Sequence, residues 1–498
     1  MERELVARYS ICGIFATLLV CVGVANSQSP RASNPPPGGK EYVICDDAVV
    51  ALSHVKVIDG TGQAARPDQT LIIRNGKIAA VGDTASTPTP PGAKVFNLIG
   101  HSLIPGLVGM HEHLFYTSAL DLDANGKLVP HLSEIAFTAP RLYLAAGVTT
   151  IRTTGSIEPY TDLDIKKQID ANRMVGPKMD VTSPYLEGSP RRFPQMHELT
   201  GPDDARRMVA FWADAGMTSF KAYTHITHAE LAVAIEEVHK HHLKLTAHLC
   251  SIGWREAAAL GIDDFAHGPT GTDAEFVIGK QPDQCPDSAA IWDSWVKMEI
   301  SSAPVKELIR DLVDRGISVT STIANTETIT PGRPDPQKRV LDVLSPQSRA
   351  SYLAQRARGP VLASASDPQM KTVFEREMQF EYAFAKAGGV LMAGSDPTGI
   401  GGTVPGFANQ REVELLVEAG FTPLEAIHIA TYNGARYLGE LDHFGTLAPG
   451  KQADLVVVKG DPSSEISDIE AVEMVFKDGV GYDPAKLLDS IRGLVGLR

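Results

Sequence analysis

The sequence lacks several features that would assign it to a special class of protein. Only five of its 498 residues are cysteine, and Phe, Trp and Tyr together make up 6%. No long run of one charge sign and no low-complexity tract interrupts the chain. These absences argue against a disulfide-rich scaffold or a disordered protein, and the 43% of apolar residues suits a globular protein with a sizeable core.

The sequence is also short of basic residues. Lys and Arg number 46 against 60 Asp and Glu, which gives a formal net charge of -14 at pH 7. Binding to nucleic acid phosphates needs clustered Lys and Arg. We therefore expect a small-molecule partner and no nucleic acid.

No apolar run reaches the length of about 20 residues that a membrane-spanning helix needs. The nearest is "ICGIFATLLVCVGVA", Ile11–Ala25, which follows two arginines and precedes small residues at Ala25 and Ser27, the spacing that signal peptidase recognises. We predict a signal peptide over 1–27 and a flexible leader over 28–40. The mature protein would be exported, periplasmic or secreted, without stable membrane insertion. Two glutamates near the start leave an uncleaved anchor as the alternative.

Three cysteines would remain after signal removal, Cys45, Cys250 and Cys285. An odd number in an oxidising compartment allows one disulfide and one free thiol. We expect Cys45 to pair with Cys285, because Cys250 lies two residues past a histidine of the candidate site. Three small buried thiols are the alternative.

Short β segments with Asp-Gly and Asn-Gly turns occur near both ends of the chain, as in "TLIIRNGKIAAVG" and "GTLAPGKQADLVVVKGDP". They predict one small β-sandwich domain built from two distant pieces, 41–100 plus 440–484. A C-terminal helix is expected over 485–498. The enclosed part, 101–439, has a different pattern and would form the catalytic domain.

The enclosed part alternates β-rich runs with segments of helical periodicity, which is typical of parallel βα units. Helical spacing is clear in "DDARRMVAFWADAG", "HAELAVAIEEVHKHH" and "REVELLVEAG". Eight strands with intervening helices predict an α/β fold of the (β/α)₈ TIM-like barrel type. An open doubly wound sheet is the alternative, but no glycine-rich phosphate loop follows the first strand. The expected strands lie in "SLIPGLVGMHEH", "GVTTIRTTG", "GPKMDVTSPYL", "TSFKAY", "LKLTAHL", "DDFAHG", "GISVTSTIA" and "GVLMAGSDP".

Polar residues interrupt these apolar runs near their C-terminal ends, where the chemistry of such barrels takes place. On the first strand, the two histidines of "MHEH" point the same way, because side chains alternate with period two. A single histidine or lysine at a strand end is often structural, but several at the same level indicate a site. The candidates are His111, His113, Lys221, His248, His267 and Asp396.

The residue types suit a divalent metal, because imidazole and carboxylate bind Zn²⁺ and similar ions. Lys221 fits such a site if its amine has captured CO₂ to form a carbamate, N6-carboxylated lysine, whose oxygens bridge two metals. Two metals roughly 4 Å apart share a hydroxide and polarise a carbonyl. Asp396 would act as general base and then as general acid.

The motif series "PGLVGMHEH … FKAY … TAHL … FAHG … AGSDP" resembles the amidohydrolase superfamily, in particular its imidazolonepropionase-like and prolidase-like branch of metal-dependent hydrolases. The resemblance extends from about Val49 to Tyr482. It implies that one metal is bound by His111, His113 and Asp396, the second by His248 and His267, with carboxylated Lys221 between them. It also makes Tyr223 a candidate for binding the substrate, with packing at the strand end as the alternative.

The chain departs from the branch at two positions that are not metal ligands. Ala266 precedes His267 where the branch often has a glutamate, and Thr153 follows Arg152 where an aspartate is common, so the substrate is left open. His131, in the expected loop after the first strand, is a further candidate for contact with the substrate.

A Pro- and Arg-rich stretch follows the seventh strand and carries Arg333, Arg339 and Arg356. Loops at this end of a barrel build pockets, so these arginines are candidates for an anionic substrate. A solvated basic loop is the interpretation that we favour.

We therefore expect an exported binuclear metal hydrolase that cleaves an amide bond of a dipeptide or an N-acyl amino acid, with two zinc ions as the expected cofactors. A cyclic amide or lactone hydrolase on the same site and a non-catalytic binding barrel are the alternatives. A mononuclear deaminase is disfavoured, because such a site needs no lysine on the fourth strand. The oligomeric state, a homo-oligomer included, is left open.

Overall fold

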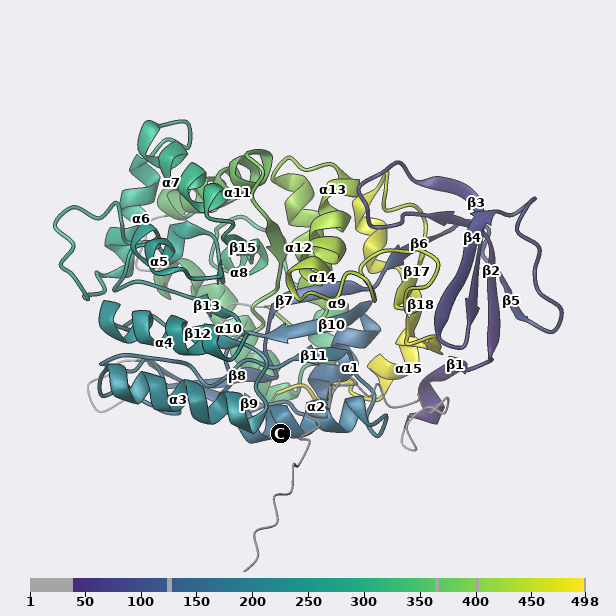
Figure 1. The fold of residues 1–498 in the computed structure, drawn as a ribbon, viewed down its shortest axis with the longest axis horizontal. Coiled ribbons are helices and arrows are strands. Elements are labelled where there is room, and N and C mark those ends of the chain that lie inside the picture. The colour runs from purple at the N-terminus through teal and green to yellow at the C-terminus, as the bar shows by residue number, and fades with distance from the viewer. Residues whose placement is uncertain (1–38, 123–127, 363–366, 399–402, 497–498) are drawn as a thin grey trace, which may run out of the picture. The chain divides into compact units, whose positions relative to one another are not determined.

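The computed structural model of the chain describes residues 39–122, 128–362, 367–398 and 403–496. The expected signal peptide and most of the leader therefore lie outside the described residues. Within them the chain has an α/β fold, with a strand-rich part formed by both ends of the chain and a larger part of parallel strands and helices (Figure 1). Across the described ranges, no helix is both long and apolar enough to cross a membrane.

The larger part contains two runs of parallel strands. One has the order β11-β10-β7 and the other the order β12-β13-β14-β15-β16. Each of the eight segments expected from the sequence contains one of these strands. Their bounds are β7 (Leu107–Glu112), β10 (Val148–Thr153), β11 (Lys178–Asp180), β12 (Phe220–Ala222), β13 (Leu245–Ala247), β14 (Asp264–Phe265), β15 (Ser318–Ser321) and β16 (Leu391–Ala393).

Backbone contacts connect the two runs at both ends. The segment after β11 forms parallel bridges to β12 and its flank, Thr182 with Ser219 and Leu186 with Ala222. At the other end, the backbone N–H of Asp396, just past β16, donates to the carbonyl of His111 in β7 at 2.9 Å. The eight strands thus follow one another in chain order, with neighbouring carboxyl ends.

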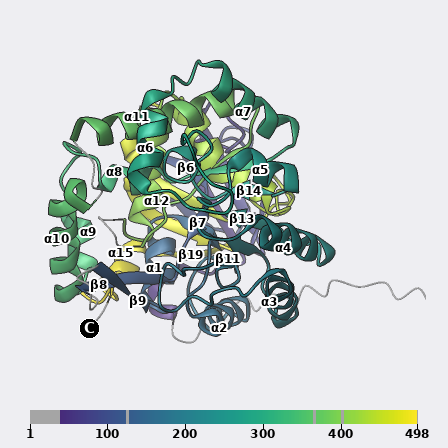
Figure 2. The same ribbon diagram turned by 90° about the vertical axis from the view of Figure 1, so that its left-hand side faces the viewer.

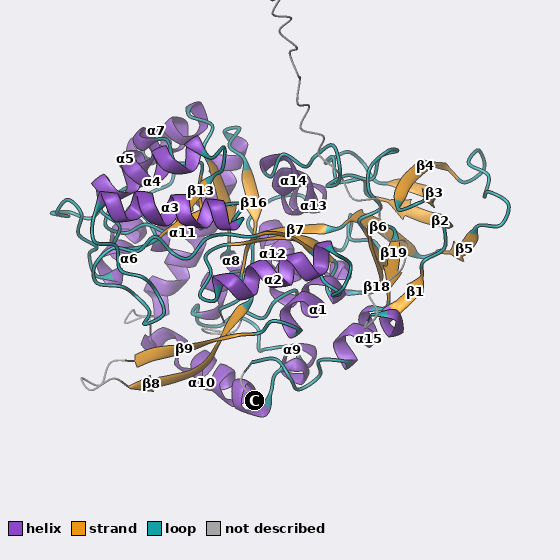
Figure 3. Cartoon of the chain, turned by 60° about the horizontal axis from the view of Figure 1, so that its bottom comes forward, coloured by secondary structure: helices purple, strands orange, loops and turns teal. Residues whose placement is uncertain are grey.

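Helices follow most of these strands and lie on more than one side of them (Figures 2 and 3). Two of the expected helices show why they form. α3 (Pro202–Ala215) ends at Gly216, whose φ of 106° suits glycine, and α4 (His228–Lys240) begins with a capping box between Thr227 and Glu230. The others are α1 (Thr138–Ala145), α2 (Pro159–Asp170), α5 (Trp254–Leu260), α6 (Ser288–Lys297), α7 (Ala303–Asp314), α8 (Ile323–Thr328), α9 (Lys338–Val343), α10 (Pro346–Leu362), α11 (Asp367–Lys386), α12 (Phe407–Glu418), α13 (Pro423–His428), α14 (Gly434–Tyr437) and α15 (Pro484–Asp489).

Strands from both ends of the chain form one mixed sheet of nine strands (Figure 1, purple and yellow). Its central pairing is β6 with β17, which joins residues more than 350 positions apart. The first expected barrel segment is therefore divided: its start belongs to this sheet as β6 and its end forms β7. The strands are β1 (Val43–Cys45), β2 (Val49–Val57), β3 (Arg66–Arg74), β4 (Lys77–Asp83), β5 (Lys94–Asn97), β6 (His101–Pro105), β17 (Leu455–Lys459), β18 (Val472–Lys477) and β19 (Val480–Tyr482).

The segment after β7 is an antiparallel hairpin of β8 (Phe115–Leu122) and β9 (Leu128–Glu134), where the sequence suggested a loop. Alternation of apolar and polar residues is weak here, so the sequence pattern does not indicate a pair of strands. His131 lies within β9 and its side chain is outside the described part of the structure. Its expected contact with the substrate therefore stays a prediction.

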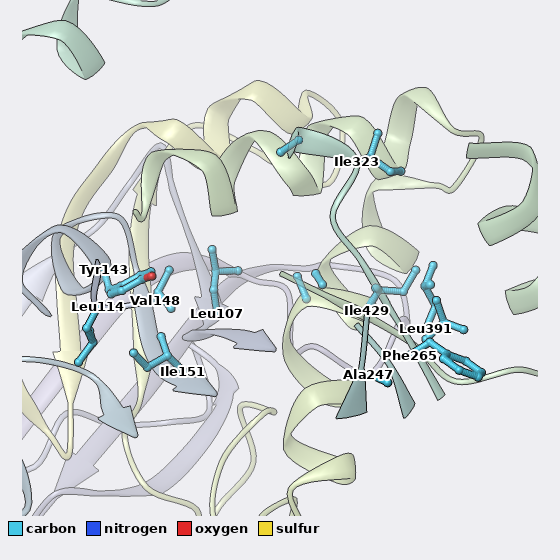
Figure 4. Close-up of a cluster of buried hydrophobic side chains, with 14 of the residues drawn as sticks. Leu107, Leu114, Tyr143, Val148, Ile151, Ala247, Phe265, Ile323, Leu391 and Ile429 are labelled. Carbon is cyan, nitrogen blue, oxygen red and sulfur yellow. The ribbon is translucent and has the colours of Figure 1, made fainter. Parts of the chain in front are cut away.

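The core of the larger part is a continuous apolar cluster that joins strands to helices. Figure 4 shows part of it: Leu107, Val148 and Ile151 lie on neighbouring strands and pack near Tyr143 of α1. Each fully buried Leu or Ile contributes roughly 1.5–3 kcal/mol. Inside the strands, Arg152 forms a two-pronged ion pair with Asp264 at 2.8 and 2.9 Å, and both side chains are fully buried. This pair ties β10 to β14.

The expected pairing of Cys45 with Cys285 is wrong. Cys250 and Cys285 form the disulfide, and Cys45 is a buried free thiol in the nine-stranded sheet. The chain after β14 returns toward the end of β13, so that Cys285 meets Cys250 rather than the distant N-terminal sheet. Proximity to a metal-ligand candidate, which was the reason for excluding Cys250, does not prevent a disulfide from forming.

Candidate metal-binding active site

The candidate site lies at the carboxyl ends of the parallel strands. A cavity of about 220 Å³ opens there, and all six of the expected metal-site residues line it. They come from five strands or from the turns directly after them, because parallel strands bring their carboxyl ends to the same edge. The residues are His111, His113, Lys221, His248, His267 and Asp396.

Three of these residues form a compact group that suits one metal ion. Ligand atoms of His111, His113 and Asp396 all lie within 4.8 Å of one another. The Nε2 atoms of the two histidines are 3.5 and 3.1 Å from Oδ1 of Asp396. Two imidazoles and a carboxylate at this spacing can hold Zn²⁺ or a similar divalent ion.

Backbone carbonyls orient the two imidazoles of this group. Nδ1 of His111 lies 2.5 Å from the carbonyl O of Ala266, and Nδ1 of His113 lies 3.3 Å from the carbonyl O of Gly155. Each Nδ1 can thus donate its hydrogen to a carbonyl, which leaves the Nε2 lone pair toward Asp396. Such partners fix the tautomer that a metal-binding histidine needs.

The second group contains His248, His267 and Lys221. The ring of His267 lies 4.4 Å from that of His111 and 4.7 Å from that of His248, measured between centroids, so the two groups are continuous. Nδ1 of His267 is 2.7 Å from Oγ1 of Thr322, which orients this ring as well.

Lys221 has a buried amine. Its side chain is 1% exposed, and its Nζ has no hydrogen-bond partner among the described residues. Burial lowers the pKa of Lys221 to about 7, and it also lowers the pKa values of His111, His248 and His267 well below their ordinary value. A neutral amine beside neutral imidazoles fits a site for cations, because protonated lysine would repel them.

Asp396 is held in an unusual backbone conformation. Its φ is 43°, in the left-handed region that few residues other than glycine adopt. Two residues earlier, a Cβ on Gly394 would lie 2.5 Å from Cβ of His111, so only glycine permits this approach of β16 to β7. Strain of this kind often accumulates at functional sites.

Asn325 supports the Asp396 carboxylate and was not found from the sequence. Its Nδ2 donates to Oδ2 of Asp396 at 2.8 Å and to the Asp396 carbonyl O at 3.2 Å. Burial by itself would raise the pKa of Asp396, but its contacts with His113 and with the nearby His267 lower it below its ordinary value. Asn325 leaves Oδ1, the oxygen nearest both histidines, free for a metal or a proton.

Glu112, between the two histidines, points away from the metal side of β7. Its carboxylate accepts hydrogen bonds from the backbone N–H and the hydroxyl of Ser395 at 3.1 and 2.5 Å, and from Nδ2 of Asn409 at 2.6 Å. It therefore anchors the turn that presents Asp396. The glutamate between the two candidate ligands therefore has a structural role, because side chains alternate along a strand and its carboxylate lies on the opposite side.

Of the other candidates, Tyr223 lines the cavity, with its ring 5.0 Å from that of His248.

The three arginines after β15 form contacts outside this cavity. Arg333 pairs with Glu327 and Glu418, Arg339 pairs with Glu470, and Arg356 donates to the Pro334 carbonyl. None of the three lines this cavity.

The cavity also has a wall that the sequence did not reveal. Arg192 and Phe193, from the chain between β11 and α3, line it together with Phe115, Leu132 and Ile329. These residues belong to a loop, a hairpin and a helix end, and no periodicity or motif distinguishes them in the sequence.

Comparison with known proteins agrees with this site. The model of the Amidohydrolase family matches residues 381–481, a stretch that includes β16 and Asp396. Over 83 residues the chain is 36% identical to adenine deaminase 2 of Jannaschia sp. (strain CCS1), a match that covers 16% of this chain and 13% of the relative. The chain thus matches only about an eighth of the length of this curated relative.

Solved structures share the fold over most of the chain. A putative prolidase from Bifidobacterium longum aligns with a TM-score of 0.63 and 22% identity, over 89% of this chain and 98% of the other. A Xaa-Pro dipeptidase with bound methionine aligns with a TM-score of 0.64 and 17% identity, over 87% of this chain and 100% of the other. The family model thus matches about a fifth of the chain, and the solved structures show that the fold of most of the chain is shared with these proteins.

Proposed function

We propose that the chain is an exported, metal-dependent hydrolase that cleaves the amide bond of a dipeptide or an N-acyl amino acid. The observation that carries the proposal is the gathering of four histidines, an aspartate and a buried lysine without a partner around one cavity. The cavity volume of about 220 Å³ suits a small substrate.

The proposal takes the eight parallel strands as a closed (β/α)₈ barrel. The backbone contacts between β11 and β12 and between β16 and β7 support closure. The position of the candidate residues at the carboxyl ends of the strands supports it too, because barrels of this type carry their active sites there.

The residues fit two divalent ions, for which zinc is our choice. His111, His113 and Asp396 would hold one, His248 and His267 the second, and N6-carboxylated Lys221 would lie between them. When bound, the metals activate water and polarise the carbonyl of the substrate. The buried Lys221 Nζ supports carboxylation, because its pKa of about 7 leaves much of the amine neutral and able to attack CO₂.

Asp396 is the proton carrier in this proposal. It would take a proton from the attacking water at Oδ1 and pass it to the nitrogen of the leaving amine, so that the C–N bond breaks without releasing an amide anion. Asn325 holds the other carboxylate oxygen at 2.8 Å and keeps Oδ1 directed into the cavity. The hydrogen bond between Ser395 and the Glu112 carboxylate holds the turn that carries Asp396.

The disulfide supports the proposed export. Disulfides persist in oxidising compartments and are rare in the reducing cytosol. Cys250 and Cys285 join the end of β13, two residues past His248, to the loop after β14. Together with the apolar segment at 11–25, this favours a periplasmic or secreted protein.

Deamination is the second candidate, since two curated relatives are adenine deaminases: the one from Jannaschia sp. named above, and adenine deaminase 1 of Carboxydothermus hydrogenoformans. Against it stands Lys221, whose buried amine has no use in a site with one metal. The matched stretch is also short, 16% of this chain for one relative and 14% for the other.

The experiment that separates these candidates measures metal content and activity together. We expect about two equivalents of zinc in the purified mature protein and cleavage of some members of a library of dipeptides and N-acyl amino acids. Lys221→Ala should lose metal and activity together. One equivalent of metal with release of ammonia from adenine would contradict the proposal and establish the deaminase.

A further inference from the structure

Besides the metal-ligand candidates, the cavity lining combines one cation with apolar side chains. Phe115 and Leu132 come from the β8–β9 hairpin, Phe193 from the loop after β11, and Ile329 from the end of α8. Arg192 adjoins Phe193 and also lines the cavity. A substrate that fills the cavity therefore meets the metal-ligand candidates as well as this mixed lining.

The guanidinium of Arg192 is free to bind a ligand. Within the described ranges of the chain, no carboxylate, carbonyl or aromatic ring pairs with it, whereas Arg333, Arg339 and Arg411 each pair with glutamates. Arg192 lines the same cavity as His248 and Tyr223. An unpaired arginine at the mouth of a small cavity suits a carboxylate, which it can bind through two hydrogen bonds.

The phenol of Tyr223 lies in the same cavity as a neutral donor. A tyrosine hydroxyl is protonated at neutral pH and can donate one hydrogen bond. Its ring lies 4.8 Å from that of Tyr185 and 5.0 Å from that of His248, between centroids. A substrate group near both Tyr223 and Arg192 would be one that accepts hydrogen bonds and carries negative charge.

We propose that Arg192 binds the free carboxylate of the substrate and so restricts the enzyme to amides that bear one. The apolar residues beside it would take the side chain of the same amino acid, which makes an apolar C-terminal residue the preferred one. This inference rests on the proposed amide hydrolysis and adds the residue that selects the substrate class.

The test compares each acid with its carboxamide, which removes the charge and keeps the shape. The substrates are the best-cleaved member of the library and its carboxamide. For the parent enzyme, kcat/KM should be higher for the acid by roughly tenfold or more, the value of one hydrogen bond to a charged group. In Arg192→Met this ratio should fall toward one, mainly through a higher KM for the acid.

Arg191→Met is the matched control. Arg191 is the exposed neighbour of Arg192 and has the same charge, but it does not line the cavity. Its substitution should leave the ratio as in the parent enzyme. Arg192→Lys should restore part of the preference, because it keeps the charge but loses the planar fork.

Calorimetry with N-acetyl-L-leucine and N-acetyl-L-leucinamide measures the contact between Arg192 and the carboxylate as a difference in binding affinity, without turnover. The acid should bind the parent protein more tightly than the carboxamide, and Arg192→Met should remove the difference. Equal binding of the two probes to the parent protein, or equal losses in Arg191→Met and Arg192→Met, would overturn the assignment. Absence of amide cleavage together with the expected binding would overturn only the proposed reaction.

Discussion

At the residue scale, Asp396 is the most constrained side chain of the site. Its backbone lies in the left-handed region, its Oδ2 accepts from Asn325, and its Oδ1 faces His111 and His113. Each constraint aims one carboxylate oxygen at the place where the metal and the proton transfer would meet. This arrangement suits one residue that serves as both ligand and proton carrier.

Asp396→Asn should keep the fold and lose the chemical step. Asparagine tolerates a positive φ, so the turn after β16 can form as before. A positioned proton carrier contributes roughly 10²- to 10⁴-fold, and we expect kcat to fall by at least about 10²-fold. Steady-state kinetics and circular dichroism measure the two effects, with the exposed Asp442→Asn as control. If Asp396→Asn cleaves amides as fast as the parent enzyme, Asp396 is not the proton carrier.

At the scale of secondary-structure elements, two buried carboxyl groups join the β8–β9 hairpin to α2. Both oxygens of Glu134, at the end of β9, and Oδ1 of Asp162 in α2 are buried. Burial raises the pKa of Asp162 to about 7, and burial together with the charge of Asp162 raises that of Glu134 well above its ordinary value. The hairpin that carries Phe115 and Leu132 is thus sensitive to pH at its base.

This pair predicts a loss of stability as pH rises. Below about pH 3, Asp162 is protonated in the folded chain and largely so in the unfolded chain. Between about pH 4 and 7 the unfolded carboxyl ionises while the buried one holds its proton, so the free energy of unfolding decreases; above about pH 7 the loss from this group is complete. Asp162→Asn removes this titration.

Thermal unfolding at pH 5 and pH 8 measures the effect. The drop in Tm between the two values should be smaller in Asp162→Asn than in the parent protein, by roughly 2 °C or more. Asp164→Asn, two residues along α2 and exposed, should behave as the parent does. An identical pH dependence in Asp162→Asn would show that Asp162 ionises freely in the folded chain.

At the scale of the whole molecule, the candidate metal ligands come from five different strands or the turns after them. Bound ions would therefore connect β7, β12, β13, β14 and β16, strands of only two to six residues each. Any ligand that binds only the folded state stabilises that state.

Removal of metal should therefore lower the Tm of the protein. Dialysis against a strong chelator should reduce it by roughly 3 °C or more, and added zinc should restore it. In Lys221→Ala, which would bind less metal, the chelator should have a smaller effect. A Tm that is the same with and without chelator would argue against metals that join these strands.

The sequence by itself indicated much of the architecture and the residues of the metal site. Short β-rich runs that alternate with segments of helical periodicity predicted the eight parallel strands and several helices, because burial imposes those patterns locally. His111, His113, Lys221, His248, His267 and Asp396 stood out because each places polarity where a strand should be apolar. The structure brings all six to one cavity.

Only the tertiary structure decided what depends on segments far apart in the chain. Cys250 rather than Cys45 meets Cys285, and Asn325 reaches Asp396 across 71 positions. Arg192 faces the cavity from a loop that no local pattern distinguishes. Short-range hydrophobic patterns indicate which segments form strands and helices. Which loops come together depends on packing throughout the fold. The chemistry of the site was therefore readable from the sequence, and the wall that would select the substrate was not.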